Sequence, residues 1–305
     1  MADNANGLPD MREATNGLVI LEPRRKPTCS LEKLEFVKTS ATTIKFTYPL
    51  KVLIPDHAGC TNCAWIYPIT YGGGLVSGDE ISLEVQVKPF CAALITTQAS
   101  TKVYHSEDNK PCVQRFKYSV ADKSLLCVLP DPIVCYKEAI YKQSQRIELS
   151  PLGNLVLLDW LTAGRTARGE IWQFTKYDSC NEIVIDGRLR FKDSVSLEET
   201  DNLSIAEAVG GFQAIALCVL LGPQLETFTE NLLRTIGRSK SFGEAYISNT
   251  IVSISPLSYD TREDVVKGCI IRIGANTTTE AFAEIEEVLS PLYSILGGDP
   301  FENKY

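Results

Sequence analysis

Three stretches of the sequence carry side chains whose types and spacing could support chemistry, and the first is a loop with soft metal ligands. His57, Cys60 and Cys63 lie close together in the chain. A structural zinc site ordinarily takes four ligands, often from two Cys-x-x-Cys pairs. This sequence has no second pair of that kind, and its only other histidine is His105. A loop with two reduced thiols is therefore the favoured interpretation, and a small metalloprotein built on these three residues is an alternative.

The second stretch is glycine-rich and runs from Gly72 to Asp79 as Gly-Gly-Gly-Leu-Val-Ser-Gly-Asp. It lacks the Gly-Lys-Ser/Thr ending of a phosphate-binding loop, and no helical pattern follows it. A glycine turn that leads into a strand at 81–87 is the simpler interpretation. Asp79 would then end a tight turn at the start of that strand.

The third stretch, from Asp159 to Glu170, combines charged side chains with two glycines, and its cations are Arg165 and Arg168. It follows some of the most apolar sequence in the chain, so two interpretations stay open. One is a salt-bridged loop on a solvated face. The other is a polar site buried against the core, where each charge needs a partner.

Several other classes of function find little support. Neither histidine has the Ser, Cys or Asp context of a nucleophilic triad. The 30 basic and 38 acidic residues give a net charge of -8, which disfavours binding to nucleic acid or to anionic lipid. The longest uninterrupted apolar run, 214–221, is far shorter than the ~18 residues of a membrane span. Most of the ten cysteines lie in apolar runs and no signal peptide is evident, which predicts a reduced, cytoplasmic protein.

The elements that must position these residues are mostly strands. Apolar and polar residues alternate with a period of two at 81–87 and 116–120, while 155–158 is apolar on both faces, as in a central strand. Asp186-Gly187 between two apolar runs predicts a type I′ hairpin. Capped helical patterns occur near 223–236 and 278–296, and 204–221 is ambiguous. We therefore expect a mainly β body that forms a single domain over 31–305, preceded by a flexible leader at 1–30.

Several longer sequence motifs then follow one another along the chain. They are Tyr71-Gly-Gly-Gly-Leu-Val-Ser-Gly-Asp79, Thr96-Thr-Gln-Ala-Ser-Thr-Lys-Val-Tyr104, Leu129-Pro-Asp-Pro132, Leu157-Leu-Asp-Trp160, Thr162-Ala-Gly-Arg-Thr-Ala-Arg-Gly-Glu170 and Gly187-Arg-Leu-Arg-Phe191-Lys-Asp193. In this order and spacing the chain resembles the urease accessory protein UreD family, called UreH in some lineages. The resemblance runs from the region of Leu31 to that of Leu296, which is almost the whole chain.

The resemblance implies both a fold and a function. The family's fold is mainly β, an irregular β-helix-like stack of short strands with two α-helices. Its members are maturation chaperones rather than enzymes, and they bind the urease apoprotein together with the accessory proteins UreF and UreG. Their complex delivers nickel to the urease active site through an internal polar tunnel. Nickel is then a cargo in transit, and no cofactor is permanently bound.

The resemblance also implies site residues, at the positions that match the family's motifs. The nickel-transit candidates are Asp79, Thr96, Thr97, Asp159 and Glu170, and the charge-balancing candidates are Lys102, Arg165 and Arg168. Carboxylates and hydroxyls suit transit because a conduit must release its ion, whereas thiolates hold a late first-row metal too tightly. We expect Asp79, Asp159 and Glu170 inside the β body along a continuous wet passage, because a lone carboxylate in a dry core would neutralise itself.

The main alternative function is an enzyme. A β-helix or β-sandwich carbohydrate-active protein would use an Asp/Glu pair, with the carboxyl groups about 5–10 Å apart in a cleft lined with aromatic side chains. For the chaperone, the two helices and 204–221 are the segments that we expect to face UreF, since proteins that act in complexes keep apolar surface exposed.

Overall fold

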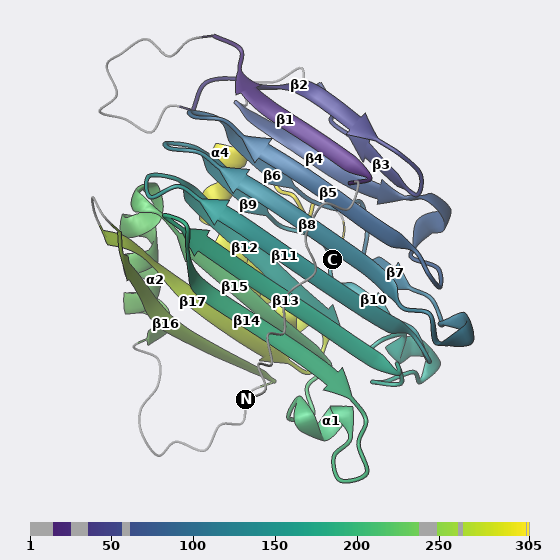
Figure 1. Cartoon of the computed structure of the whole chain (residues 1–305). Helices are drawn as coiled ribbons and strands as arrows, with labels where there is room; N and C mark the ends of the chain where they lie inside the picture. Colours follow the sequence, from purple (N-terminus) through teal and green to yellow (C-terminus); the bar gives the residue numbers. More distant parts are fainter. Residues whose placement is uncertain are drawn as a thin grey trace, which may run out of the picture.

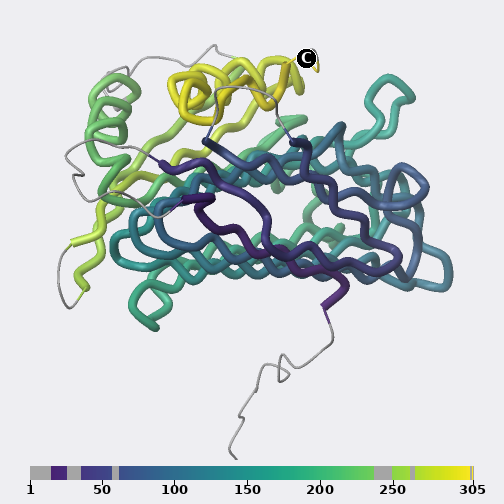
Figure 2. The backbone as a smooth tube through the Cα atoms, turned by 90° about the horizontal axis from the view of Figure 1, so that it is seen from above, coloured from purple at the N-terminus to yellow at the C-terminus, as the bar shows by residue number. Residues whose placement is uncertain are grey.

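The computed structural model describes residues 15–25, 36–56, 62–237, 249–261, 265–302 and 304. Two sheets lie face to face, and helices cover the outer face of the second sheet (Figures 1 and 2). Successive strands stack as in a β-solenoid, which confirms the mainly β, β-helix-like fold that the sequence predicts.

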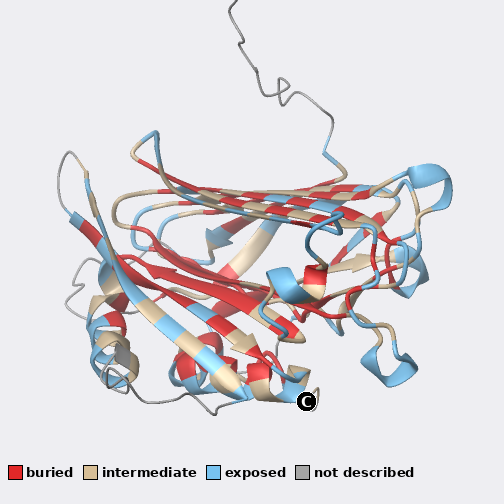
Figure 3. Cartoon of the chain, turned by 90° about the horizontal axis from the view of Figure 1, so that it is seen from below, coloured by how far each residue is buried: buried red, intermediate tan, exposed pale blue. Residues whose placement is uncertain are grey.

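The first sheet has seven strands in the order β14-β13-β11-β8-β5-β1-β2. Ion pairs occur on its outer face, for example between Arg146 and Glu182 at 3.2 Å. Among the described residues, no helix covers this face (Figure 3). The strands are β1 (Gly17–Pro23), β2 (Thr39–Phe46), β5 (Glu80–Val87), β8 (Cys112–Val120), β11 (Ile140–Leu149), β13 (Lys176–Ile185) and β14 (Arg188–Glu198).

The second sheet has ten strands, with the main order β16-β17-β15-β12-β9-β6-β4-β3, while β10 pairs with β12 and with β7. Its strands are β3 (Leu50–Leu53), β4 (Cys63–Thr70), β6 (Ala92–Ile95), β7 (Thr101–Val103), β9 (Leu125–Val128), β10 (Ile133–Cys135), β12 (Asn154–Thr162), β15 (Ala214–Leu221), β16 (Thr250–Asp260) and β17 (Val265–Ala275).

The chain winds back and forth between the sheets. β5, β8 and β11 belong to the first sheet, and each is followed by β6, β9 or β12 in the second. Each strand therefore pairs in parallel with the strand one turn later, as β5 pairs with β8 and β8 with β11. Parallel strands need a crossover connection, usually a helix. In this fold the strands of the opposite sheet form the crossover, so none of these turns requires a helix.

The predicted hairpin is confirmed at β13 and β14. Ile185 pairs with Arg188, and the two residues between them, Asp186 and Gly187, have φ angles of 51° and 71°. Positive φ at both central positions is the property of a type I′ turn.

Helices form a third layer. Both predicted helices are confirmed as α2 (Glu226–Gly237) and α3 (Thr278–Leu289), with α4 (Tyr293–Leu296) after the second. The Thr277 hydroxyl accepts a hydrogen bond from the Glu280 backbone N–H at 3.1 Å and so caps α3. The ambiguous segment divides into α1 (Ile205–Ala208) and strand β15. Short 3-10 turns complete the fold: η1 (Tyr71–Gly73), η2 (Glu107–Asn109), η3 (Thr166–Arg168), η4 (Pro223–Leu225) and η5 (Ser290–Leu292).

The central strands of the second sheet are buried on both faces, whereas its edge strand β16 has no buried residue (Figure 3). On β12, Leu155 and Leu157 pack into the core between the sheets, whereas Val156 and Leu158 pack into the core under the helices. This arrangement confirms the central strand predicted at 155–158. In the part of the chain that the structure describes, no helix has both the length and the apolar character needed to cross a membrane.

The expected leader is wrong for part of its length. Residues 17–23 form β1, which pairs with β2 and β5, and the side chains of Val19 and Leu21 are fully buried. The reason is that this segment alternates inward and outward side chains and completes the apolar face of the first sheet. Residues 1–14 and 26–30 lie outside the described residues.

One glycine in β17 provides a test of the strand packing. A Cβ atom at Gly268 would lie 1.9 Å from the carbonyl oxygen of Leu220 on β15. We expect Gly268→Ala to lower the free energy of unfolding by about 1–3 kcal/mol, the usual cost of overpacking. Chemical denaturation checks this value, with Ser255→Ala at an exposed position of β16 as the control. Equal stability of the two variants would contradict the close approach of β15 and β17.

Candidate functional site

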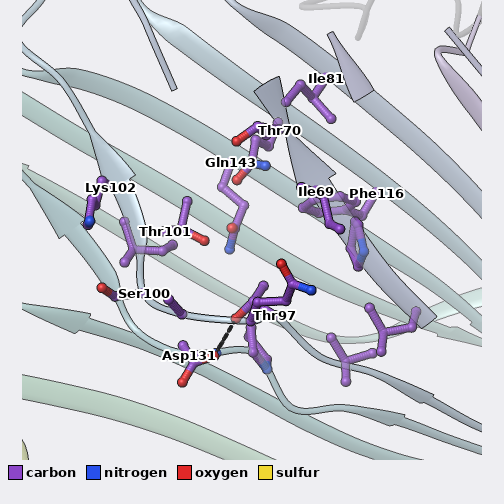
Figure 4. Close-up of a pocket in the computed structure, with 18 of the residues that line it drawn as sticks. Ile69, Thr70, Ile81, Thr97, Ser100, Thr101, Lys102, Phe116, Asp131 and Gln143 are labelled. Atoms are coloured by element: carbon purple, nitrogen blue, oxygen red, sulfur yellow. Dashed lines mark hydrogen bonds between the residues drawn. The ribbon is translucent and has the colours of Figure 1, made fainter. Parts of the chain in front are cut away.

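A cavity of about 200 Å³ lies between the two sheets. Much of the interior around it is apolar, but polar side chains from both sheets face this cavity (Figure 4). The polar residues that line it include Thr97, Lys102, Gln114, Asp131, Gln143, Gln145 and Asp159.

Asp159 is held at the centre of this site by its place on β12. It follows the inward-facing Leu155 and Leu157 at a spacing of two, so its carboxylate points toward the first sheet. Three groups of that sheet donate hydrogen bonds to it. They are Asn181 Nδ2 at 2.7 Å and Ser179 Oγ at 2.9 Å, both to Oδ2, and Gln143 Nε2 at 3.2 Å to Oδ1.

The donors to Asp159 belong to a polar ladder that crosses three strands of the first sheet. Gln143 of β11 pairs with Gln114 of β8 on one side and with Ser179 of β13 on the other. Gln145 Nε2 donates to Asn181 Oδ1 at 3.0 Å. These amides and hydroxyls are buried, and their mutual bonds satisfy groups that would otherwise be costly to bury.

Burial raises the pKa of the Asp159 carboxyl above its ordinary value. The hydrogen bonds from Asn181, Ser179 and Gln143 oppose this rise, because they favour the ionised form, and the negative charge of Asp193 adds to it. A nearby cation would therefore stabilise the ionised form of Asp159.

A second cavity, of about 280 Å³, lies on the other side of Asp159. Asp159 and Trp160 line both cavities, so the two meet at these residues. Asp193 of β14 also lines the second cavity and forms an ion pair with Arg272 of β17 at 2.9 Å. Sequence reasoning missed Asp193 as a site residue. Its pairing with Asn181 across the β13–β14 hairpin is the signal that could have found it.

The structure brings three of the predicted site residues together. Thr97, Lys102 and Asp159 all line the first cavity. Thr96 is fully buried but does not line it, and within the described residues its hydroxyl has no hydrogen-bond partner.

Asp79 does not join this group, so its expected place on an internal passage is wrong. Its carboxylate accepts a hydrogen bond from the Val76 backbone N–H at 2.9 Å, and its own N–H donates to the Val76 carbonyl. The side chain therefore stabilises the glycine turn that leads into β5, as the simpler interpretation of this stretch predicts.

Glu170 also lies away from both cavities, so the expectation of an internal position is wrong for it too. Its carboxylate forms a two-point ion pair with Arg165, through Nε at 2.8 Å, and this pairing holds the pKa of Glu170 below its usual range. The Arg165 guanidinium lies 4.0 Å from the centre of the Tyr136 ring, and Arg168 is exposed. Residues 166–169 are exposed, so this segment is a salt-bridged loop at the surface.

Within the described residues no cysteine forms a disulfide, and every one except Cys180 is buried. Cys63 is buried in the core under the helices, and this burial raises its thiol pKa far above the usual range. His57 and Cys60 lie outside the described residues. Elsewhere in the described chain, no three His, Cys, Asp or Glu side chains are grouped to hold a metal ion. The metalloprotein alternative gains nothing from these positions.

The cavity size bears on the enzyme alternative. Pockets for organic ligands usually measure about 300–1,000 Å³. The first cavity, at about 200 Å³, falls below this range, whereas a neighbouring hollow that shares Asp131 with it measures about 400 Å³ and falls within the range.

The fold and the site together define a class: a β-solenoid-like protein with cavities between its two sheets that polar side chains help to line. The model of the UreD urease accessory protein family matches residues 31–303, and the chain belongs to this family. The resemblance seen in the sequence is thereby confirmed.

Three relatives illustrate this membership. Urease accessory protein D of Oryza sativa subsp. indica is 36% identical over 283 residues, which cover 86% of this chain and 91% of the relative. The protein of the same name in Arabidopsis thaliana is 36% identical over 280 residues, covering 87% and 95%. Urease accessory protein UreD of Anaeromyxobacter sp. strain Fw109-5 is 35% identical over 253 residues, covering 83% and 80%.

The raised pKa of Asp159 predicts a stability effect with a definite sign. A carboxyl whose pKa is higher in the folded state favours folding when protonated and opposes it when ionised. Asp159→Asn removes the charge, so we expect its Tm to equal or exceed that of the wild type at pH 7. The advantage should shrink as the pH falls through the folded-state pKa, because the wild-type carboxyl then takes up a proton.

Thermal unfolding of both proteins over a series of pH values checks this prediction. Asp79→Asn is the control, since that carboxyl stabilises a turn rather than facing a cavity. A Tm for Asp159→Asn below the wild-type value at pH 7, with no change in the difference as pH falls, would show that the carboxylate is a net stabilising group.

Proposed function

We propose that this protein is a non-catalytic chaperone of urease maturation, and that nickel ions pass through it on their way to the urease active site. Its relatives carry the name urease accessory protein, which supports a role in maturation. The observation that carries the nickel proposal is the Asp159 carboxylate, which lines both internal cavities and sits among neutral hydrogen-bond donors.

Asp159 has the chemistry that a transit site requires. A conduit must bind its ion well enough to admit it and weakly enough to release it. One carboxylate supported by neutral amides offers such a site, whereas a closed set of thiolates would retain the ion. Lys102 and Thr97 line the cavity on one side of Asp159, and Asp193 lines the cavity on the other. These residues mark the proposed path.

The proposal includes the partners UreF, UreG and the urease apoprotein. Helix α2 supports an interface with UreF, because its apolar residues Phe228, Leu232, Leu233 and Ile236 are only partly buried against the second sheet. Helix α3, by contrast, buries Phe282, Ile285 and Val288. These partly buried apolar side chains are the basis on which we propose α2 as the UreF-facing surface.

Nickel loading of urease tests the passage. We expect Asp159→Asn to lower the nickel content and activity of urease several-fold in a urease-positive host, while UreF and UreG are still captured with the variant. The variant keeps the size of the side chain but loses the charge that attracts the cation. Metal analysis of purified urease, with pull-down of the accessory proteins, gives both readouts.

Glu170→Gln is the matched control. It also removes one carboxylate charge, but from the surface loop, so nickel loading should stay near the wild-type level. Equal losses in the two variants, or normal loading with Asp159→Asn, would refute a passage at Asp159.

The partner surface on α2 has its own test. Leu233 is half-buried and lies beside the inward row of this helix. We expect Leu233→Asp to weaken capture of UreF and, because the side chain packs partly against the core, to lower Tm moderately, whereas Asn231→Asp at an exposed position should do neither. Unchanged capture with both variants would place the UreF interface elsewhere.

A further inference from the structure

Beside the first cavity, the side chain of Lys304 places its ammonium group among oxygen atoms of a distant part of the chain. Its Nζ donates to Asp131 Oδ2 at 2.8 Å and to the carbonyl oxygen of Thr97 at 2.7 Å. The Thr97 hydroxyl donates to the same carboxylate oxygen at 2.8 Å and accepts from the Asp131 N–H at 2.8 Å. The Lys304 ammonium group is therefore bound by a carboxylate and a backbone carbonyl, and the Thr97 hydroxyl lies next to them.

This ion pair is largely shielded from solvent. The side chain of Asp131 is 1% exposed and that of Lys304 is 17% exposed. A charge so deeply buried needs a partner of opposite sign, because water cannot solvate it. Asp131 lies in a setting where its carboxylate holds a cation, and in this structure Lys304 supplies one.

The Lys304–Asp131 pair lies next to the first cavity, which is part of the proposed nickel passage. Asp131 lines the first cavity together with Asp159, and it also lines a neighbouring hollow of about 400 Å³. Lys304 lines that hollow but not the cavity. Figure 4 shows the bond between Thr97 and Asp131 on the same side of the cavity as Ser100, which lines both spaces. The ammonium thus lies where the hollow meets the cavity.

Lys304 reaches this place from an anchored segment. Phe301 is buried at 2% exposure and packs against Phe282 of α3, with ring centres 5.4 Å apart. The Asp299 carboxylate accepts a hydrogen bond from the Phe301 N–H at 2.8 Å. The anchor keeps the lysine close, while its flexible four-carbon stem allows the ammonium to leave without unfolding of the segment.

We propose that Thr97 and Asp131 form an oxygen-donor site for a divalent cation at the mouth of the first cavity, occupied by the Lys304 ammonium until a metal ion displaces it. The inference rests on the proposed nickel passage and adds a gate to it. Carboxylate, carbonyl and hydroxyl oxygens are ligands for hydrated divalent cations, and they bind such ions weakly enough for release. Lysine and metal compete, so the carboxylate is never left without a cation.

Direct metal binding to the purified full chain tests the site, with nickel chloride as the probe. Lys304→Met removes the charge and keeps most of the stem. We expect this variant to bind one more nickel ion per chain than the wild type at the same free concentration, with at least a tenfold gain in affinity at that site. Isothermal titration calorimetry and equilibrium dialysis measure both quantities.

The added binding must depend on Asp131. The double variant Lys304→Met with Asp131→Asn should therefore lose it and return to the wild-type stoichiometry. Lys192→Met is the matched control, because that lysine pairs with Glu182 at 2.9 Å on the outer face of the first sheet and lines neither space. We expect it to bind no more nickel than the wild type.

The site is disproved if Lys304→Met binds no more nickel than the wild type, or if the gain persists in the double variant. Lys304→Gln covers the case in which the methionine variant does not fold, since its amide can still donate to Asp131 and Thr97 without a charge. The same gain is expected with it, together with a larger rise in its Tm on addition of nickel than the wild type shows.

The outcome can be separated from that of the passage. If Lys304→Met gains the Asp131-dependent site while nickel loading of urease is insensitive to Asp159→Asn, the cation site stands and the passage fails. If loading depends on Asp159 and Lys304→Met gains nothing, the passage stands and the gate fails.

Discussion

The interior of this protein contains one costly feature, the Asp159 carboxylate, which is half-buried between the two sheets beside two cavities. A charge in a low-dielectric interior is unfavourable unless hydrogen bonds or water compensate it. Here Gln143, Ser179 and Asn181 reach across from the first sheet and donate to it. The contact links the two sheets, because its donors come from β11 and β13 and its acceptor comes from β12. Both cavities that Asp159 lines therefore combine apolar walls with a few polar side chains.

The winding of the chain makes this polar stripe possible. Each turn adds one strand to each sheet, so that corresponding positions of successive turns become neighbours through parallel pairing. Gln114, Gln143 and Ser179 are far apart in the sequence, yet they stand side by side across three strands. The apolar residues of the same strands form the rest of the core, and the helices cover the remaining face of the second sheet. Polar groups are thus concentrated in one band, and the apolar core around that band supplies the stability.

Acidic residues near this band differ in how their charge is balanced. Glu170 is paired with Arg165 in a surface loop, and Asp79 closes a turn, so neither contributes to the interior. Asp193 is balanced by Arg272, and Asp131 by Lys304, each across a contact between separate parts of the chain. Asp159 lies between the sheets and is stabilised by neutral side-chain donors. A carboxylate in that setting has the most to gain from a passing cation.

The sequence by itself determined the classes of element and much of their position. Period-two patterns located the strands, Asp186-Gly187 located the hairpin, and caps located α2 and α3, because local backbone preferences and side-chain alternation act over a few residues. The family's motifs also selected Thr97, Lys102 and Asp159, which meet at the cavity. Three things were decided by tertiary structure alone. Strand β1 is part of the core because it pairs with β5, a strand about 60 residues later in the chain. Glu170 lies outside the interior because Arg165 of the same loop neutralises its charge. Asp131, Asp193 and Lys304 acquired their roles through partners 79 to 173 residues away, and contacts at that separation leave no local pattern to read.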